Sequence, residues 1–217
     1  DVCSSDLVRI QGAAEAGLET AVKSARAQGF RADGGAAIVM DVNSGRVLAM
    51  ASYPTYDPNI WEKGLTGAQA KDMYSASTYV PALSRPLQGL FSPTSTFKAI
   101  SIFAAVKAGY NLNASYDCPA SYKVGNRDFT NYESKELGRM NLKTGIAVSC
   151  DTLWYKIAYA EWLKDGGLSP KNSNDFFFNA AHQFQLDKKT GIDLPGESSG
   201  RDRKSTRLNS SHGYISY

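Results

Sequence analysis

Two apolar runs around a short turn constrain the fold more than any other feature of this sequence. Residues 35–42 read Gly-Ala-Ala-Ile-Val-Met-Asp-Val, residues 43–45 read Asn-Ser-Gly, and residues 46–52 read Arg-Val-Leu-Ala-Met-Ala-Ser. Apolar runs joined by a turn of this composition predict a β-hairpin. Because both runs are almost continuously apolar, we expect both faces of the hairpin to be covered, as in the middle of a sheet.

Helical periodicity marks four further stretches. We expect helices over about 11–28, 66–77, 93–108 and 142–162, the third beginning at a proline and ending at a glycine. Between the last two lies a Tyr-, Asn- and Gly-rich excursion over about 110–140. No internal repeat and no low-complexity linker is visible.

Composition narrows the class of protein. A chain of 217 residues that is 42% hydrophobic and 21% charged has enough apolar mass for a globular core. Its net charge of +3, without a basic stripe, argues against a nucleic-acid partner. No apolar run is long enough for a membrane span.

Cysteine and histidine are scarce. With 3 cysteines, 2 histidines and no Cys-x-x-Cys pair, we expect neither a metal site nor a cofactor. Cys118 and Cys150 either pair in an oxidising compartment or remain free thiols, and the sequence leaves both alternatives open.

The two ends differ from the middle. Residues 1–7 and 202–217 have no periodicity and resemble translated sequencing-adapter sequence, so we set them aside as probable artefact. We therefore expect residues 8–201 to be a partial domain, truncated at both ends.

Ser95-Thr-Phe-Lys98 lies in the first turn of the apolar helix that follows Pro93. A spacing of three places the hydroxyl and the amine on one helix face. A serine nucleophile needs a base, and no histidine is suitably placed. Burial and the positive end of a helix dipole both favour the neutral amine, so Lys98 is our candidate base.

A second motif, Ser149-Cys-Asp151, begins a helical stretch. By itself it is better explained by helix capping than by chemistry. Serine β-lactamases and penicillin-binding proteins, however, use Ser-x-x-Lys, then Ser-x-Asn, then Lys-Thr-Gly, in that order.

Together with their flanks, these motifs closely resemble the transpeptidase domain of class B penicillin-binding proteins. Residues 35–54 resemble its first strands, 87–98 its active-site segment and 190–200 a stretch downstream. Ser-Cys-Asp, with Tyr132-Glu-Ser ahead of it, resembles the elongation-type actinobacterial branch. The resemblance covers about 9–201. It implies an α+β (mixed α/β) fold of the penicillin-binding protein and serine β-lactamase type, with an antiparallel sheet flanked by helices and incomplete on its C-terminal side.

The same resemblance implies the role of each site residue. Ser95 is expected to be acylated, with its backbone N–H forming half of an oxyanion hole. Lys98 is expected to act as the base, Ser149 to relay a proton to the leaving group, and Asp151 to contact the substrate.

Two positions depart from the pattern. Thr94 stands where many relatives have Gly. Asp151 stands in place of an amide, and an ionised carboxylate only accepts hydrogen bonds, which puts its substrate contact in doubt.

The third motif is not evident. Lys-Thr-Gly occurs at 143–145 and 189–191, but the first runs into a helix and the second into a short, proline-broken segment unsuited to an edge strand. We expect the true motif downstream, and we therefore expect the 217-residue chain to lack measurable transpeptidase activity.

The resemblance implies a D,D-transpeptidase that cross-links peptidoglycan. Its partners would be D-Ala-D-Ala stem peptides, β-lactams and a SEDS-family glycosyltransferase, at the extracytoplasmic face of the cell membrane. A serine β-lactamase or β-lactam sensor is one alternative, and a non-catalytic fragment is another.

Overall fold

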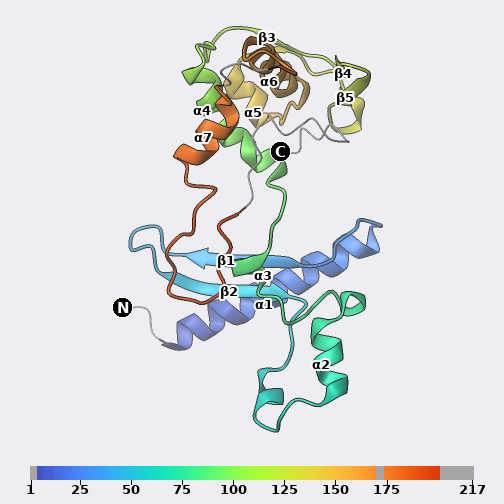
Figure 1. Cartoon of the computed structure of the whole chain (residues 1–217), viewed down its shortest axis with the longest axis vertical. Coiled ribbons are helices and arrows are strands. Elements are labelled where there is room, and N and C mark those ends of the chain that lie inside the picture. Colours follow the sequence, from blue (N-terminus) through green and yellow to red (C-terminus); the bar gives the residue numbers. More distant parts are fainter. Residues whose placement is uncertain (1–3, 170–173, 201–217) are drawn as a thin grey trace. The chain divides into compact units, whose positions relative to one another are not determined.

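The computed structural model describes residues 4–169 and 174–200 (Figure 1). The chain divides into two compact units, and each is described by itself. The first, the hairpin unit, comprises residues 1–90 and 191–198; the second, the motif unit, comprises residues 91–190 and 199–217. The predicted artefact at 202–217 lies outside the described residues, as do residues 1–3.

The hairpin unit is built from α1 (Ser4–Ala27), β1 (Gly35–Met40), β2 (Val47–Tyr53), α2 (Gly67–Tyr74) and α3 (Arg85–Gln88). Short 3₁₀ turns lie at Pro58–Trp61 and Ala76–Thr78. The helix expected from about residue 11 begins at Ser4, inside the stretch that we set aside, so the boundary at residue 7 stays a prediction.

The predicted hairpin is confirmed. β1 and β2 pair antiparallel, with Ile38 opposite Met50. At the turn, the Asp41 carboxylate accepts hydrogen bonds from the Asn43 N–H at 3.0 Å and the Ser44 hydroxyl at 2.6 Å. Two backbone hydrogen bonds also close the turn, from the Gly45 N–H to the Asp41 carbonyl oxygen at 2.8 Å and from the Asp41 N–H to the Arg46 carbonyl oxygen at 2.9 Å.

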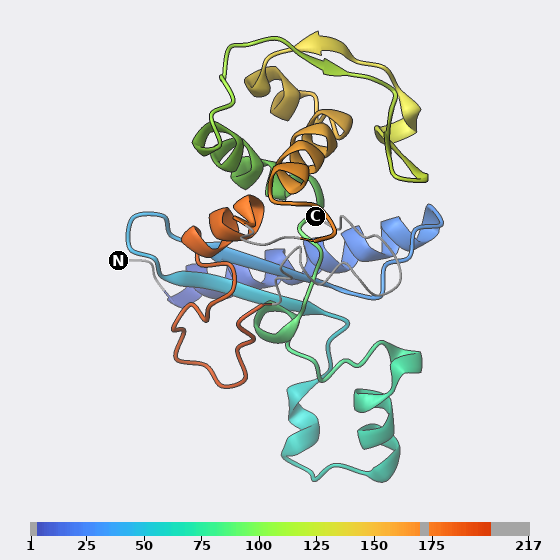
Figure 2. The ribbon, with the colours of Figure 1, turned by 45° about the horizontal axis from the view of Figure 1, so that its top comes forward.

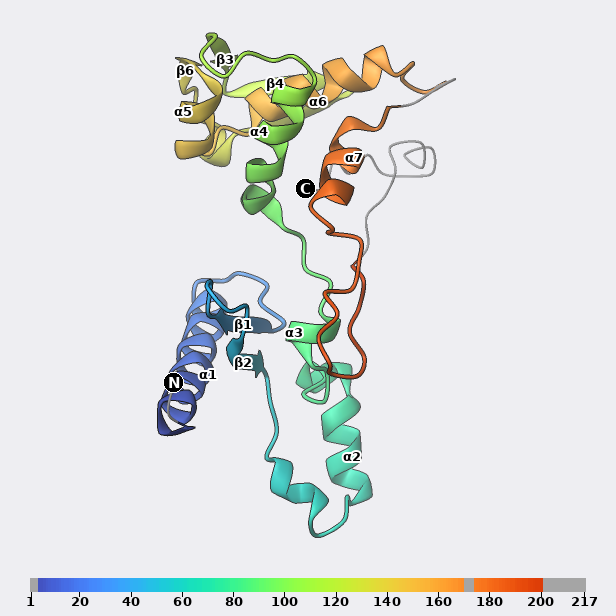
Figure 3. The same cartoon turned by 90° about the vertical axis from the view of Figure 1, so that its left-hand side faces the viewer.

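One face of the hairpin packs on α1, which runs along it (Figure 3). Gly35 marks the close approach, because a Cβ there would lie 2.8 Å from Leu18 Cδ1. Side chains alternate along a strand, so this face also carries Ala49 and Ala51, which are buried.

The expectation that both faces are covered holds only in part for the described residues. On the face opposite α1, helix α3 contacts both strands, and the Ser52 hydroxyl donates to the Leu83 carbonyl oxygen at 3.1 Å. Ile38 and Met40 lie on this same face, where they are 49% and 53% exposed. Within residues 4–169 and 174–200 this sheet has two strands, and α1 covers one side of it. A continuous apolar run reports strand propensity, but it does not show what packs on each face.

The motif unit contains helices and two small sheets. Its helices are α4 (Lys98–Lys107), α5 (Leu142–Ala147), α6 (Thr152–Lys164) and α7 (Phe176–Gln183), and a 3₁₀ turn over Thr94–Phe97 precedes α4. The excursion at 110–140 forms β3 (Tyr116–Cys118) with β6 (Gly138–Met140), and β4 (Ser121–Val124) with β5 (Arg127–Thr130). A further 3₁₀ turn spans Tyr132–Ser134. Figure 2 shows these strands arching beside α6, which they contact.

The single helix predicted over 142–162 is wrong. The chain breaks between α5 and α6, and Ser149 in the break has a φ of +55°. The left-handed region is rare for residues other than glycine, so no simple sequence pattern predicts that Ser149 adopts it. The break matters for function because it turns the Ser149–Asp151 segment out of the helix.

The core of the motif unit lies against the first turns of α6. Its largest fully buried side chains are Trp154, Leu142 and Leu153, with Ala105 and Ile157 beside them. None of the described helices combines the length and apolar character that crossing a bilayer requires.

Candidate active site

Ser95 is presented by the 3₁₀ turn that leads into α4. Thr94, just before it, has a φ of +47°, and the chain then enters the helix at Lys98. The Ser95 residue is exposed, whereas Lys98, one turn later, is buried. The turn therefore offers a reachable hydroxyl above an enclosed amine.

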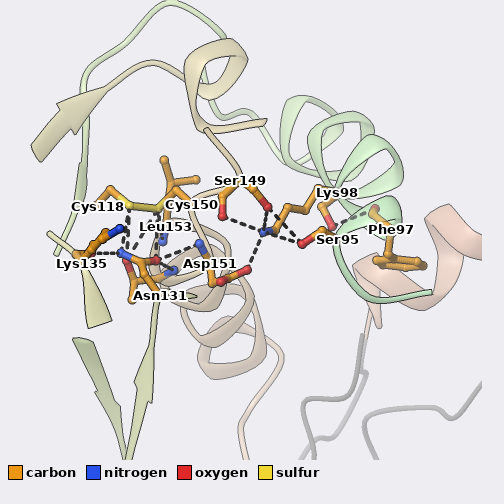
Figure 4. Close-up of polar contacts among 12 residues, drawn as sticks. Ser95, Phe97, Lys98, Cys118, Asn131, Lys135, Ser149, Cys150, Asp151 and Leu153 are labelled. Atoms are coloured by element: carbon orange, nitrogen blue, oxygen red, sulfur yellow. Dashed lines mark hydrogen bonds and ion pairs between the residues drawn. A yellow bond between two sulfur atoms is a disulfide. The ribbon is translucent and has the colours of Figure 1, made fainter. Parts of the chain in front are cut away.

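The Lys98 ammonium is surrounded by oxygen acceptors (Figure 4). Its Nζ lies 3.2 Å from Ser95 Oγ, 2.9 Å from Ser149 Oγ and 3.0 Å from the Ser149 carbonyl oxygen. It also forms an ion pair with Asp151 Oδ1. The Lys98 side chain is 3% exposed and that of Asp151 is 23% exposed, so the pair is largely screened from water.

Ser149 completes the link between the two motifs. Its hydroxyl donates to Ser95 Oγ at 3.0 Å. The capping alternative is wrong for this motif: Asp151, not Ser149, occupies the cap position of α6, and the Asp151 side chain makes no capping hydrogen bond. The structure thus brings together all four residues that the sequence singled out.

A disulfide joins Cys118 to Cys150, which resolves the two alternatives left open above. Cys150 stands between Ser149 and Asp151, and both half-cystines are essentially inaccessible, at 1% and 0%. The bond ties the second motif to the end of β3.

Asn131 is a site residue that sequence reasoning missed. Its Oδ1 accepts hydrogen bonds from the backbone N–H groups of Asp151 at 2.9 Å and Thr152 at 3.0 Å. Nothing in the residues around it distinguishes this asparagine from the others in the 110–140 excursion, because its role arises from contacts made across the fold.

The Asp151 carboxylate affects the pKa of the neighbouring Tyr155 phenol. Burial, and then the Asp151 carboxylate, raise the pKa of Tyr155 above its ordinary value, while Arg127 opposes the shift. The Tyr155 phenol is therefore neutral at physiological pH.

Other candidates lie apart from this cluster. His182 contacts Asp187 at 2.7 Å, and that hydrogen bond lowers the pKa of the Asp187 carboxyl. The first Lys-Thr-Gly lies within α5 and the second in an irregular segment, so neither is on a strand. Among the described residues, no three His, Cys, Asp or Glu side chains gather in a way that suits a metal ion.

Comparison with known proteins gives consistent matches. Residues 35–216 match the family model described as the penicillin binding protein transpeptidase domain. Peptidoglycan D,D-transpeptidase MrdA of Escherichia coli strain K12 is 31% identical over 171 residues, which cover 76% of this chain and 25% of the relative. The chain thus spans about a quarter of the length of the curated relatives it matches.

Solved structures extend the likeness to the fold. The structure of Pseudomonas aeruginosa PBP2 in complex with WCK 5153 matches with a TM-score of 0.64 and 26% identity, over 86% of this chain and 40% of that one. A structure described as a peptidoglycan synthase complex that coordinates polymerization and crosslinking matches with a TM-score of 0.67 and 28% identity, over 86% and 33%. These matches confirm the predicted fold class.

Proposed function

The chain belongs to the penicillin-binding protein transpeptidase family, and from that membership we propose that it serves as the acyl-serine centre of a peptidoglycan D,D-transpeptidase. The observation that carries the proposal is the three-way contact among the Ser95 hydroxyl, the Lys98 amine and the Ser149 hydroxyl. Its relatives include enzymes named peptidoglycan D,D-transpeptidase.

In the first half-reaction, Ser95 Oγ attacks the carbonyl carbon between the two terminal D-Ala residues of a stem peptide. The hydroxyl proton passes to a neutral Lys98 amine, within reach at 3.2 Å. As the C–N bond breaks, a proton passes through the Ser149 hydroxyl to the leaving D-Ala amine. The product is an ester between Ser95 and the shortened stem peptide.

In the second half-reaction, the amine of another stem peptide attacks this ester. A new amide bond forms, the Ser95 C–O bond breaks, and the proton released by the amine returns to Ser95 Oγ. A β-lactam would enter at the first step and, with its ring opened, remain on the serine.

Asp151 is assigned a second role beside its predicted substrate contact. Its ion pair with Lys98 holds the amine between the two serine hydroxyls. A carboxylate can form this ion pair, whereas the amide usual at this position cannot.

We further propose a glycosyltransferase of the SEDS family as a partner and the extracytoplasmic face of the cell membrane as the place of action. The first is supported by the likeness to a peptidoglycan synthase complex. The second is supported by the Cys118–Cys150 disulfide, because such bonds persist in oxidising compartments.

The test is covalent labelling by a fluorescent penicillin. Because the chain spans only part of its relatives, the protein used is a fusion in which residues 1–200 are followed by the remaining transpeptidase segment of E. coli MrdA. We expect one stable adduct per chain, mapped by mass spectrometry to Ser95 and abolished in Ser95→Ala.

Ser101→Ala is the matched control. Ser101 lies on the same helix, and its hydroxyl donates to the Phe97 carbonyl at 3.2 Å instead of facing Lys98, so its loss should leave labelling intact. Labelling that persists in Ser95→Ala, or an unlabelled wild-type fusion, would contradict the proposal. Rapid turnover of the penicillin would instead indicate a β-lactamase.

A further inference from the structure

Helix α6 begins immediately after the second motif. The backbone N–H groups of its first turn find their hydrogen-bond acceptors in an unusual way. The first N–H groups of a helix have no partner within the helix, and an aspartate at the cap position ordinarily accepts one of them. Asp151 holds that position but makes no such bond. Its carboxylate is instead paired with Lys98.

Asn131, from another part of the chain, accepts from two other N–H groups at the start of this helix, those of the cap residue and of the residue after it (Figure 4). Its Oδ1 lies 2.9 Å from the Asp151 nitrogen and 3.0 Å from the Thr152 nitrogen. Its Nδ2 donates to the Pro119 and Lys135 carbonyl oxygens, each at 2.8 Å. The residue is 4% exposed, so these four bonds are made away from water.

The chemistry of the four partners requires an amide at this position. Two partners are N–H donors and two are carbonyl acceptors, so a flipped side chain would oppose like with like on both sides. An aspartate would keep the acceptor but lose the donor, and an alanine would lose both.

We propose that Asn131 is a positioning residue for the acylation site. By capping α6 from outside, it leaves the Asp151 carboxylate available to Lys98 and fixes the backbone from which Asp151 projects. The inference rests on the proposed function for its effect on acylation, but the geometry that it describes is independent of activity.

Two neighbouring contacts also hold the 118–135 segment against the start of α6. The Thr152 hydroxyl donates to the same Pro119 carbonyl oxygen at 2.8 Å. The disulfide joins the residue just before Pro119 to the residue between Ser149 and Asp151. Asn131 differs from both because it alone contacts the backbone N–H of Asp151.

The experiment compares Asn131→Ala and Asn131→Asp with Asn141→Ala. Asn141 is the matched control, since its side chain caps α5 by accepting from the Thr144 N–H at 2.9 Å, without a contact to the site. Hydrogen exchange of individual backbone amides is measured on the full chain, and the rate of labelling by fluorescent penicillin is measured on the fusion.

For Asn131→Ala we expect amide exchange at Asp151 and Thr152 to accelerate by about tenfold or more. Labelling should slow by roughly 10- to 100-fold, as expected when a reacting group is misplaced. Asn131→Asp keeps the Oδ1 acceptor but loses the Nδ2 donor, so both amides should stay more protected than in Asn131→Ala and labelling should be faster than in Asn131→Ala, though slower than in the wild type. Asn141→Ala should accelerate exchange at Thr144 and change labelling by no more than about twofold.

The outcomes separate two ideas. If Asn131→Ala leaves exchange at Asp151 and Thr152 unchanged, or slows labelling no more than Asn141→Ala does, the positioning role is overturned. The same holds if Asn131→Asp is as slow as Asn131→Ala, which would indicate a purely structural amide. Should Asn131→Ala fail to fold, the Asn131→Asp result decides. An unlabelled wild-type fusion would overturn the proposed function, and the exchange data would still test the capping.

Discussion

Thr94 illustrates how a single residue is placed at a cost to stability. It adopts a φ of +47°, a conformation in which a β-branched side chain clashes with its own backbone. Glycine has no such penalty. The strain lies directly beside Ser95, so it affects the turn that presents the nucleophile.

We expect Thr94→Gly to stabilise the protein by about 1 kcal/mol, since the relief of left-handed strain exceeds the loss of backbone restriction. The melting temperature should rise by a few degrees. Thr96→Gly, in the same turn but without a positive φ, should lower it. A lower melting temperature for Thr94→Gly would show that the hydroxyl or methyl group of Thr94 makes a compensating contact.

At the scale of elements, the sequence predicted some features well and others not at all. The helix that carries Lys98 followed from the apolar periodicity after Pro93, although α4 begins at Lys98 and a 3₁₀ turn carries Ser95. The hairpin followed from its turn. Ser149 was placed inside a helix because its neighbours have helical spacing. Its left-handed backbone is contacted by Lys98 and adjoins a disulfide to Cys118, and both partners are distant in sequence. For the same reason, Asn131 could not be identified before the fold was known.

The contact between Tyr110 and Glu161 ties the end of the α4 segment to α6. The Tyr110 hydroxyl donates to Glu161 Oε1 at 2.8 Å. Burial first, and then this hydrogen bond, raise the pKa of the phenol above its ordinary value. A raised pKa means that the unfolded chain releases the proton at a lower pH than the folded protein does.

The stabilising effect of Tyr110 is therefore complete below pH about 10, the ordinary tyrosine value, and is lost as the pH rises above it. We expect the free energy of unfolding to fall with pH above this point by up to about 1.4 kcal/mol per unit, less where solvent screens the group. Tyr110→Phe should remove this part of the slope.

Urea denaturation at a series of pH values between 8 and about 11 measures the slope. Glu161→Gln should reduce the slope but leave part of it, because burial is the largest single cause of the shift. Equal slopes in the wild-type protein and Tyr110→Phe would contradict the assignment.

At the scale of the whole molecule, the notable surface is the exposed part of the hairpin face opposite α1. Ile38 and Met40 project from it, and the hairpin turn adds Val42, which is 92% exposed. Exposed apolar strands favour self-association, and a net charge of +3 provides little repulsion between copies.

We expect the double substitution of Ile38 and Met40 by threonine to reduce self-association of the purified chain while leaving its melting temperature within a few degrees. Dynamic light scattering and sedimentation velocity measure the first property. Ala51→Thr is the control on the α1 side: it inserts a hydroxyl where the residue is 1% exposed, so it should destabilise the unit without improving solubility. Unchanged association in the double variant would indicate that copies meet through another surface.

Amine-reactive reagents in solution should not modify Lys98. Its ammonium faces three oxygen-bearing side chains and a carbonyl, and the side chain is 3% exposed, whereas those of Lys23, Lys135 and Lys164 are at least 62% exposed. A reagent that acylates free amines will modify these surface lysines and leave Lys98 unmodified. The residue proposed as the base is thus protected from electrophiles that arrive from solvent, and only a molecule bound at Ser95 brings a reactive carbonyl to it.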